Sequence, residues 1–286
     1  MRDPTDGQAS PPREFRFTRE EFDYLRKVVN DHTGIVLSEH KFDMVYARLV
    51  RRIRELGLSG FDAYVERVRS DHGDELAQLI NAITTGLTAF FREPHHYQTL
   101  RDQVVPSARA RRRLRIWSAG CSSGEEPYSI AITVLEEIAD TEREPEGWDI
   151  RVLATDLDTH ALARARLGVY PIERLEPVSS VRRRRWFLRG RGTRSGEARV
   201  KPVLQQHVTF NRLNLLEDWP SLGAVDAIFC RNVMIYFDQP TKTRLLHRFR
   251  QTLGPGGWLF LGHSESLIGI SDVFDLVGRT TYRVPQ

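Results

Sequence analysis

The sequence predicts an α/β protein in which a small all-α domain precedes a Rossmann-like sheet. Three observations predict this fold. Residues 15 to 84 show only helix-spaced apolar positions, whereas short apolar runs alternate with helical segments from Leu114 onward. Two more apolar segments lie close together around Gly278 and Arg279. The length of 286 residues agrees with about two domains of roughly 150 residues each.

The N-terminal part is expected to contain four helices. Thr18, ahead of Glu20 and Glu21, suits the N-cap of the first, and Gly57 ends the second. The apolar faces lie at 22–29, 42–56, 64–68 and 76–83. The other face of the second helix carries Arg48, Arg51, Arg52 and Arg54. We predict a helical domain over residues 15–90, preceded by a disordered tail at 1–14.

The remainder, 91–286, is expected to form one sheet domain. Its strand-like runs are Leu114–Ser118, Ile150–Thr155, Val208–Asn211, Val225–Cys230 and Trp258–Gly262. Helical segments such as Glu126–Ile138 and Gln239–Leu253 separate them, and Pro255 to Gly257 suggest a turn before the last run. Continuous apolar strands between helices predict a parallel sheet covered on both faces. Val273–Val277 and Thr280–Val284 predict a terminal antiparallel hairpin, which is typical of methyltransferase folds and less so of dehydrogenases.

Composition excludes several classes of protein. A chain that is 40% hydrophobic and 28% charged is too apolar to be disordered. Apolar runs stay short of the roughly 20 residues that a bilayer span needs, and polar, Pro-rich residues 1–12 resemble neither a signal peptide nor an anchor. Cys121 and Cys230 alone cannot build a disulfide framework, so we expect a cytoplasmic protein. We expect both to be buried packing residues. No metal is expected, since adjacent His95 and His96 point to different helix faces and the histidines lack ligand spacing.

The positive charge is concentrated in one segment. Nine basic residues and one acid lie between Arg182 and Lys201, a net charge of +8 against +4 for the whole chain. Arg-Gly spacing with β-formers on both sides predicts a small inserted β-subdomain over 170–206. The patch could bind an acidic partner or nucleic acid, or be the solvated face of an arginine-rich helix.

The segment Ile116–Pro127 runs from a predicted strand into a helix. Its small residues let the backbone approach a ligand, and the helix start offers free N–H groups. It does not read GxGxxG. Glu125 and Glu126 would repel a pyrophosphate but could hold an ammonium group, which favours S-adenosylmethionine over a dinucleotide. The alternative is that they only cap the helix. Asp156, at the end of the second strand, suits the hydroxyls of a ribose.

Five segments, in order along the chain, resemble CheR-type chemotaxis receptor methyltransferases. They are Thr84–Glu93, Gly120–Ser129, Ala154–Asp158, Phe229–Phe237 and Gly262–Ser266. The resemblance covers nearly all of the chain from about residue 15. It implies a helical N-terminal domain and a class I methyltransferase domain. The implied reaction is methyl transfer from S-adenosylmethionine to glutamate side chains on chemoreceptor cytoplasmic helices, a step in sensory adaptation and signal transduction that releases S-adenosylhomocysteine.

The resemblance also implies a cofactor site. Arg92 would meet the cofactor carboxylate, Glu126 its ammonium group and Asp156 its ribose. The remaining cofactor-binding positions are Gly86, Thr88, Asn214, Leu215, Arg231 and Asn232. The family usually has asparagine where Gly86 stands. As catalytic residues we expect Tyr236 to orient the acceptor carboxylate, with Arg92 nearby; the alternatives are core packing for Tyr236 and a structural ion pair with Glu93 for Arg92. A structural hydrogen bond is expected for His263.

In family members with a longer, glycine-bearing insert, the β-subdomain docks on a receptor C-terminal peptide. This resemblance implies a receptor-tail site formed by Arg189, Gly190, Gly192, Gly196 and Arg199. An acidic peptide could add there as a strand, with the arginines pairing to its carboxylates.

The partners implied are receptor helices and the receptor tail, with neither nucleic acid nor membrane insertion, for a protein expected to be monomeric. A nucleic-acid methyltransferase is disfavoured because the fourth strand ends in Arg231–Met234 rather than in an Asn/Asp-Pro-Pro-aromatic motif. A non-catalytic module that binds S-adenosylmethionine or a receptor is the other alternative.

Overall fold

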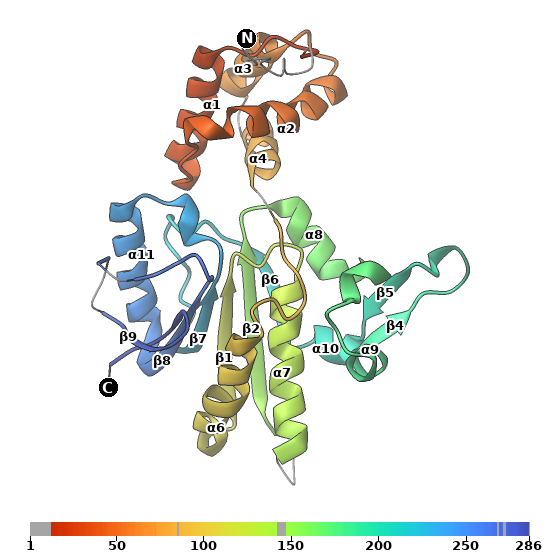
Figure 1. Cartoon of the computed structure of the whole chain (residues 1–286), viewed down its shortest axis with the longest axis vertical. Helices are drawn as coiled ribbons and strands as arrows, with labels where there is room; N and C mark the ends of the chain where they lie inside the picture. Colours follow the sequence, from red (N-terminus) through yellow and green to blue (C-terminus); the bar gives the residue numbers. More distant parts are fainter. Residues whose placement is uncertain are drawn as a thin grey trace, which may run out of the picture. The chain divides into compact units, whose positions relative to one another are not determined.

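The computed structural model describes residues 13–71, 73–84, 86–141, 147–267, 269–270 and 273–285, which divide into two compact units (Figure 1). The first contains the described residues up to His32 and Leu37–Ile83, and the second contains Thr33–Val36 and the chain from Thr84. Most of the predicted tail at 1–14 lies outside the described residues. Arg13 and Glu14, the two residues of that segment that are described, form ion pairs with Asp43 and Arg54.

The first unit is helical. It contains α1 (Arg19–Thr33), η1 (Glu39–Lys41), α2 (Phe42–Glu55), α3 (Phe61–Ser70) and α4 (Asp74–Ile83). Thr18 caps α1 as predicted: its Oγ1 accepts from Glu21 N at 3.2 Å, while Thr18 N donates to Glu21 Oε2 at 2.6 Å. Phe17 packs on Phe42 and Phe61 with ring centroids 4.6 and 4.1 Å apart. Aromatic side chains ahead of α1 and at the starts of α2 and α3 thus share one core.

The second unit is built on a seven-stranded sheet of order β6-β2-β1-β7-β8-β10-β9. Its strands are β1 (Arg113–Ala119), β2 (Asp149–Asp156), β6 (Val208–Arg212), β7 (Val225–Cys230), β8 (Leu253–Leu261), β9 (Asp275–Gly278) and β10 (Thr281–Arg283). The first five run parallel, and β10 pairs antiparallel with β8 and β9. The parallel sheet and the terminal hairpin are therefore confirmed.

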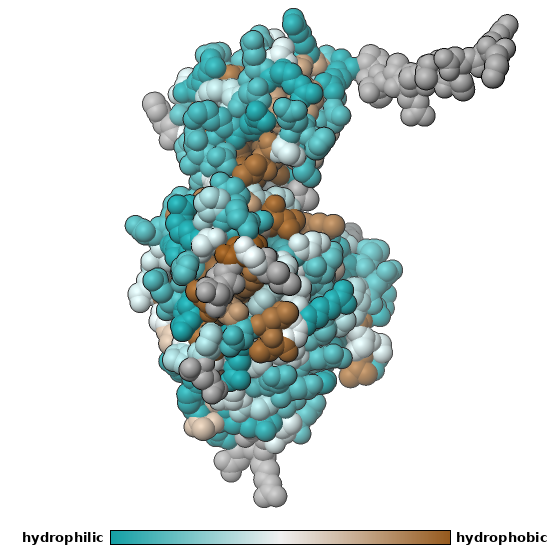
Figure 2. Space-filling view, turned by 60° about the vertical axis from the view of Figure 1, so that its left-hand side comes forward, coloured by the Kyte–Doolittle hydropathy of each residue, from teal (hydrophilic) through white to brown (hydrophobic). Residues whose placement is uncertain are grey.

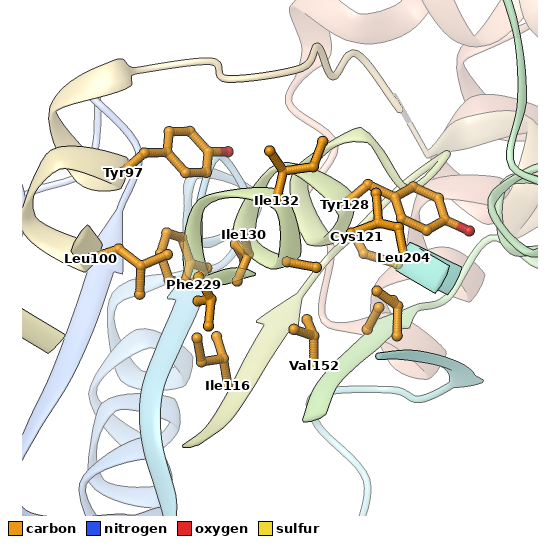
Figure 3. Packing of buried hydrophobic residues seen from close by; sticks show 14 of the residues in the cluster. Tyr97, Leu100, Ile116, Cys121, Tyr128, Ile130, Ile132, Val152, Leu204 and Phe229 are labelled. Atoms are coloured by element: carbon orange, nitrogen blue, oxygen red, sulfur yellow. The ribbon is translucent and has the colours of Figure 1, made fainter. Parts of the chain in front are cut away.

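Helices cover both faces of this sheet (Figure 1). The chain enters through α5 (Pro94–Thr99), η2 (Leu100–Val104), α6 (Val105–Ser107) and η3 (Arg109–Arg111), and later forms α7 (Glu125–Thr141), α8 (Thr159–Leu167), η6 (Met234–Tyr236) and α11 (Gln239–Thr252). Figure 3 shows Ile130 and Ile132 of α7 above Ile116 and Phe229 of the sheet. On the opposite face, Trp117 packs edge-on against Phe249 of α11 at 5.5 Å. Successive residues of β1 thus enter two different cores, because side chains alternate along a strand.

A three-stranded antiparallel sheet, β3-β5-β4, is inserted after α8. It contains β3 (Val169–Pro171), β4 (Phe187–Arg189) and β5 (Glu197–Val200), with η4 (Ile172–Leu175), α9 (Ser180–Trp186) and η5 (Gly192–Arg194) between them and α10 (Pro202–Gln205) following. The pairing of β4 with β5 confirms the predicted hairpin.

One predicted turn lies elsewhere. Pro255, Gly256 and Gly257 fall inside β8, where the partner register jumps from Val225↔Leu253 to Ala227↔Trp258. They form a bulge rather than a helix-to-strand turn, since glycine and proline suit both features and the sequence does not separate them.

Within the described residues, the helices are all too short or too polar to cross a bilayer. The face shown in Figure 2 is mainly hydrophilic, with scattered apolar areas, as is normal for a folded surface.

Candidate active site

Two loops meet where β1 and β2 end. The N–H groups of Gly120 and Cys121 donate to Thr155 O at 2.8 and 2.9 Å, which ties the loop after β1 to the end of β2. Gly120 has φ +91°, and a Cβ there would lie 2.3 Å from Val233 Cγ2. Only glycine allows this backbone conformation and this close approach together.

Asp156 fixes the shape of the loop. Its Oδ2 accepts from Ser122 N at 2.7 Å and its Oδ1 from Asp158 N at 2.9 Å. Burial raises the pKa of Asp156, while these backbone donors act in the opposite direction. A carboxylate has about four lone-pair positions, so capacity would remain for a ribose hydroxyl. The residue can hold both the loop and a ligand.

The two acids at the start of α7 have separate environments. Glu125 is fully buried and pairs with Arg174 Nε at 3.1 Å, facing the inserted subdomain. Glu126 accepts from Ser118 Oγ at 2.8 Å and pairs with Arg231 Nη1 at 3.0 Å. Burial raises the pKa of Glu126, against the effect of Arg231 and Ser118. Of the two acids, therefore, it is Glu126 that contacts residues at the ends of β1 and β7.

Arg231 joins three segments of the chain. Besides Glu126, its guanidinium donates to the Tyr97 hydroxyl at 3.3 Å and to the Arg92 carbonyl oxygen. Its Nη2 also lies 3.3 Å from Glu93 Oε2. These contacts are made by a side chain that is only 2% exposed. Arg231 therefore positions the backbone around Arg92, rather than pointing freely at a ligand.

Glu93, His95 and His96 bring their ligand atoms within 4.8 Å of one another, a set that could hold a metal ion. The Arg231 guanidinium already lies beside Glu93 Oε2, and a second cation there would be repelled. Arg231 and His263 outweigh burial and lower the pKa of Glu93. Burial and Arg231 lower the pKa of His96 to about 3. The cluster is best described as an ion-pair network, and the absence of a metal stays a prediction.

The predicted cofactor residues before α5 lie on one short loop. Ser122 Oγ donates to Gly86 O at 3.0 Å, and a Cβ on Gly86 would lie 2.6 Å from Ser122 Oγ. Thr88 and Arg92 are half-buried, and Arg92 Nη1 donates to Leu87 O at 3.0 Å rather than to Glu93. The loop is bonded to the residues around Asp156, but its own side chains remain partly accessible.

Asn214 and Leu215 follow β6 and are both buried. Asn214 Oδ1 accepts from Leu216 N at 3.0 Å, and its Nδ2 donates to Glu217 Oε1 at 3.1 Å. Leu213 N bonds to Asp156 O at 3.1 Å, which brings this turn beside the end of β2.

The turn after β7 carries Asn232 and Tyr236. Asn232 has φ +59°, a left-handed conformation that asparagine tolerates better than most residues. Tyr236 is half-buried, and its carbonyl oxygen accepts from Val36 N at 2.8 Å. His263, from the loop after β8, bonds Glu93 Oε1 through N at 3.2 Å and Nδ1 at 2.9 Å, which confirms the structural hydrogen bond expected for it.

The predicted receptor-tail residues lie in the inserted sheet, apart from the motif loops. Arg189 and Arg199 are exposed, and Leu188, which is 50% exposed, pairs with Arg199 across the strands. A Cβ on Gly190 would lie 1.9 Å from Arg194 O. Gly192 has φ +58°, and Gly196 O accepts from Ile172 N at 2.9 Å. The glycines shape the hairpin, while the arginines are available to a partner.

Sequence reasoning missed several contributors. Four residues that were not predicted for the site contact Glu126, Arg231 or Asn232, which were. They are Ser118, Tyr97, Glu93 and Glu265. Glu93 and Glu265 stand in segments that carry the resemblance, which was a signal, but nothing in their neighbours assigns their partners. Cys121 and Cys230 are buried, as expected, and burial raises the pKa of both thiols.

Comparison with known proteins agrees with this geometry. The family description "CheR methyltransferase, SAM binding domain" matches residues 86–283, and "CheR methyltransferase, all-alpha domain" matches 20–84. Chemotaxis protein methyltransferase 2 of Pseudomonas aeruginosa is 47% identical over 270 residues, 94% of each chain. The chemotaxis protein methyltransferase of Escherichia coli is 45% identical over 93% of this chain and 91% of its own. Among solved structures, the N-methyltransferase NodS of Bradyrhizobium japonicum is 14% identical with a TM-score of 0.40 over 76% of this chain and 100% of its own, too distant to inform the site.

Proposed function

Because this chain belongs to the CheR methyltransferase family, we propose that it transfers a methyl group from S-adenosylmethionine to glutamate side chains on the cytoplasmic helices of chemoreceptors. The methyltransferase activity, the methyl donor and the chemotaxis role follow from the family. The glutamate acceptor, the receptor helices and the cytoplasmic location are our proposal.

One observation carries this proposal: the five motif segments are bonded into a single site. Gly86 is bonded to Ser122, and Ser122 to Asp156. Arg231 links Glu126 to the carbonyl of Arg92, and the Glu93–His263 and Asn232–Glu265 bonds bring in the last segment. Residues far apart in sequence therefore converge at the carboxyl ends of parallel strands, where open α/β sheets bind ligands.

The residues fit S-adenosylmethionine, which supplies an electrophilic methyl group on a sulfonium when bound. Asp156 would accept from the ribose hydroxyls through its remaining lone pairs, and Arg92 would pair with the methionine carboxylate. Glu126 would hold the ammonium group. We assign the adenine end to Asn214 and Leu215, and the remaining contacts to Gly86, Thr88 and Asn232. Arg231, which the resemblance also places at the cofactor, would act by holding the backbone around Arg92. The acids disfavour a pyrophosphate at the same place.

The chain need not supply a base. A glutamate carboxyl with a pKa near 4.3 is already ionised at neutral pH, so the acceptor arrives as a nucleophile. Correct orientation can contribute on the order of 7–11 kcal/mol to such a step. We assign the orientation of the acceptor carboxylate to Tyr236, on the turn that packs against Gly120.

The inserted sheet is our candidate for the receptor tail. β4 is an edge strand, so its outer side can accept an extended peptide. Leu188 and Arg199 lie side by side on the exposed face, where they would suit a peptide with aromatic and acidic residues. Arg189 adds a second cation. Binding here would raise the concentration of receptor near the active site.

The test is incubation of the protein with radiolabelled S-adenosylmethionine and chemoreceptor membranes, with Asp156→Ala as the inactive control. Base-labile methyl label on the receptor is expected, because carboxyl methyl esters hydrolyse in alkali. Cofactor binding without transfer would instead support a non-catalytic module, and base-stable label would contradict a glutamate ester.

A further inference from the structure

We propose that Glu265 is a positioning residue that fixes the turn 231–236 against the cofactor loop. This inference deepens the proposed function, on which its kinetic test rests. Glu265 lies in the loop after β8, is 6% exposed, and has no role in the assignments above.

Three backbone N–H groups donate to the Glu265 carboxylate. Oε2 accepts from Gly262 N at 2.5 Å and from Asn232 N at 2.8 Å, while Oε1 accepts from Ile235 N at 3.2 Å. Two of these donors belong to the turn that follows β7. Hydrogen bonds from N–H groups to a carboxylate are stronger than those to a neutral acceptor, and a buried N–H without a partner is costly. The carboxylate therefore holds both ends of the turn.

The turn needs such support because its backbone is unusual. Asn232 has φ +59°, a left-handed conformation that few residues other than glycine adopt without support from their surroundings. A Cβ on Gly262 would lie 2.5 Å from Asn232 Nδ2 and 2.8 Å from Asn232 N. The absence of a side chain at 262 thus lets the loop after β8 come close enough for Glu265 to reach the turn.

The same turn contacts the cofactor side of the site. Val233 packs directly over Gly120, where a Cβ would lie 2.3 Å from Val233 Cγ2. Arg231, at its start, bonds Glu126 and the carbonyl of Arg92. Tyr236, at its end, is our candidate for orienting the acceptor. A displacement of this turn would therefore change the spacing between donor and acceptor.

The variant Glu265→Gln tests the inference, since it keeps the shape of the side chain. In either orientation of the amide, its NH₂ group faces at least one of the three backbone N–H groups, so that N–H loses its acceptor. We expect kcat to fall by about 10- to 100-fold, the range that a displacement near 1 Å can cause. The affinity for S-adenosylhomocysteine, measured by calorimetry, should change less. If the glutamine variant does not fold, Glu265→Asp takes its place in the test, because the shorter side chain cannot reach the N–H groups of Asn232 and Ile235.

A double-mutant cycle separates positioning from general damage. If Glu265 acts through Tyr236, Glu265→Gln combined with Tyr236→Phe should be little worse than the poorer single variant. Asp71→Asn is the matched control, since Asp71 Oδ2 also accepts from three backbone N–H groups, those of Gly73, Glu75 and Leu76, in the helical unit. It should lower stability without the kcat loss. The proposal would be overturned if the fold-losses in kcat of Glu265→Gln and Tyr236→Phe multiply in the double variant. It would also be overturned if the kcat of Glu265→Gln stays within twofold of wild type.

Amide hydrogen exchange gives a readout that needs no activity. Glu265→Gln should speed the exchange of residues 231–236 by at least tenfold, whereas Asp71→Asn should not. If the wild type transfers no methyl group, the proposed function fails, and exchange alone decides whether Glu265 holds the turn. Unchanged protection of 231–236 in a folded Glu265→Gln variant contradicts the inference.

Discussion

Arg231 Nη1 lies 3.0 Å from Glu126 Oε2, and the two side chains are 2% and 10% exposed. The pair joins the end of β7 to the first turn of α7. Because Arg231 also bonds Tyr97 and the Arg92 carbonyl, it holds three segments of the site together. A buried ion pair adds little net stability over apolar residues, but removal of one partner leaves a buried charge.

Arg231→Met should therefore lower the free energy of unfolding of the sheet unit by about 3–5 kcal/mol. Urea denaturation followed by tryptophan fluorescence measures this unit alone, since all five tryptophans lie beyond residue 116. Adding Glu126→Gln should cost less than the sum of the two single changes. Arg101→Met, from the exposed pair with Asp102 in the same unit, should cost no more than about 0.5 kcal/mol. Additive losses at 126 and 231 would contradict the coupling.

Asp156→Ala should weaken binding of S-adenosylhomocysteine by about 10- to 100-fold, equivalent to about 1.5–3 kcal/mol for bonds to a charged acceptor. The change removes both the proposed ribose acceptor and the partner of Ser122 N. Isothermal titration calorimetry measures the affinity. Asp149→Ala, at the exposed start of the same strand, should bind as wild type. An unchanged affinity of Asp156→Ala would remove Asp156 from the cofactor site.

Gly120→Ala should destabilise the unit and weaken cofactor binding. The added Cβ meets Val233 at 2.3 Å, and φ +91° is strained for alanine. Gly223→Ala isolates the backbone strain, because Gly223 has φ +68° with open space around its Cβ position. We expect Gly120→Ala to lower the thermal midpoint further than Gly223→Ala, and Val233→Ala to restore part of the difference. Equal losses in the two glycine variants would show that contact with Val233 is unimportant.

Arg199→Glu should weaken binding of an acidic receptor-tail peptide at least tenfold and leave affinity for S-adenosylhomocysteine unchanged. The reversed charge repels the peptide carboxylates on the exposed face of β5. Arg184→Glu, an equal change of charge on α9, should have a smaller effect. Calorimetry with both ligands gives the comparison, and equal losses in the two variants would mean that only overall charge matters.

Cys121 and Cys230 should not react with a thiol reagent in the folded protein. Both are buried, and burial raises the pKa of each thiol above its ordinary value, so the reactive thiolate stays scarce even at mildly alkaline pH. Titration with a chromogenic disulfide should detect two thiols only after guanidinium is added. Ser195→Cys, at an exposed position of the inserted hairpin, provides a reactive control. Rapid reaction in the native wild type would contradict the burial.

Most helices and strands could be predicted from the sequence, whereas the hydrogen-bond and ion-pair partners of the site residues could not. The predicted strand Val225–Cys230 agrees with β7 at both ends, because a continuous apolar run is a local property. The glycines of β8 predict a turn but form a bulge, because a bulge and a turn use the same residue types. Asp156 could be placed at a strand end, whereas its hydrogen bond from Ser122 N could not.

Periodicity and short motifs are local signals, so the order of helices and strands, the family, and the strand ends at which the motif residues stand could all be predicted from the amino-acid sequence. The tertiary structure decided which of two adjacent acids joins the site: Glu126 reaches Arg231, while Glu125 turns to Arg174. It also decided that Glu265 holds the turn at Asn232, 33 residues away. A buried charge pairs with whichever polar group folding brings within about 3 Å. Sheet topology decides which group that is, because it sets which strand ends lie side by side, whereas neighbours in the chain do not.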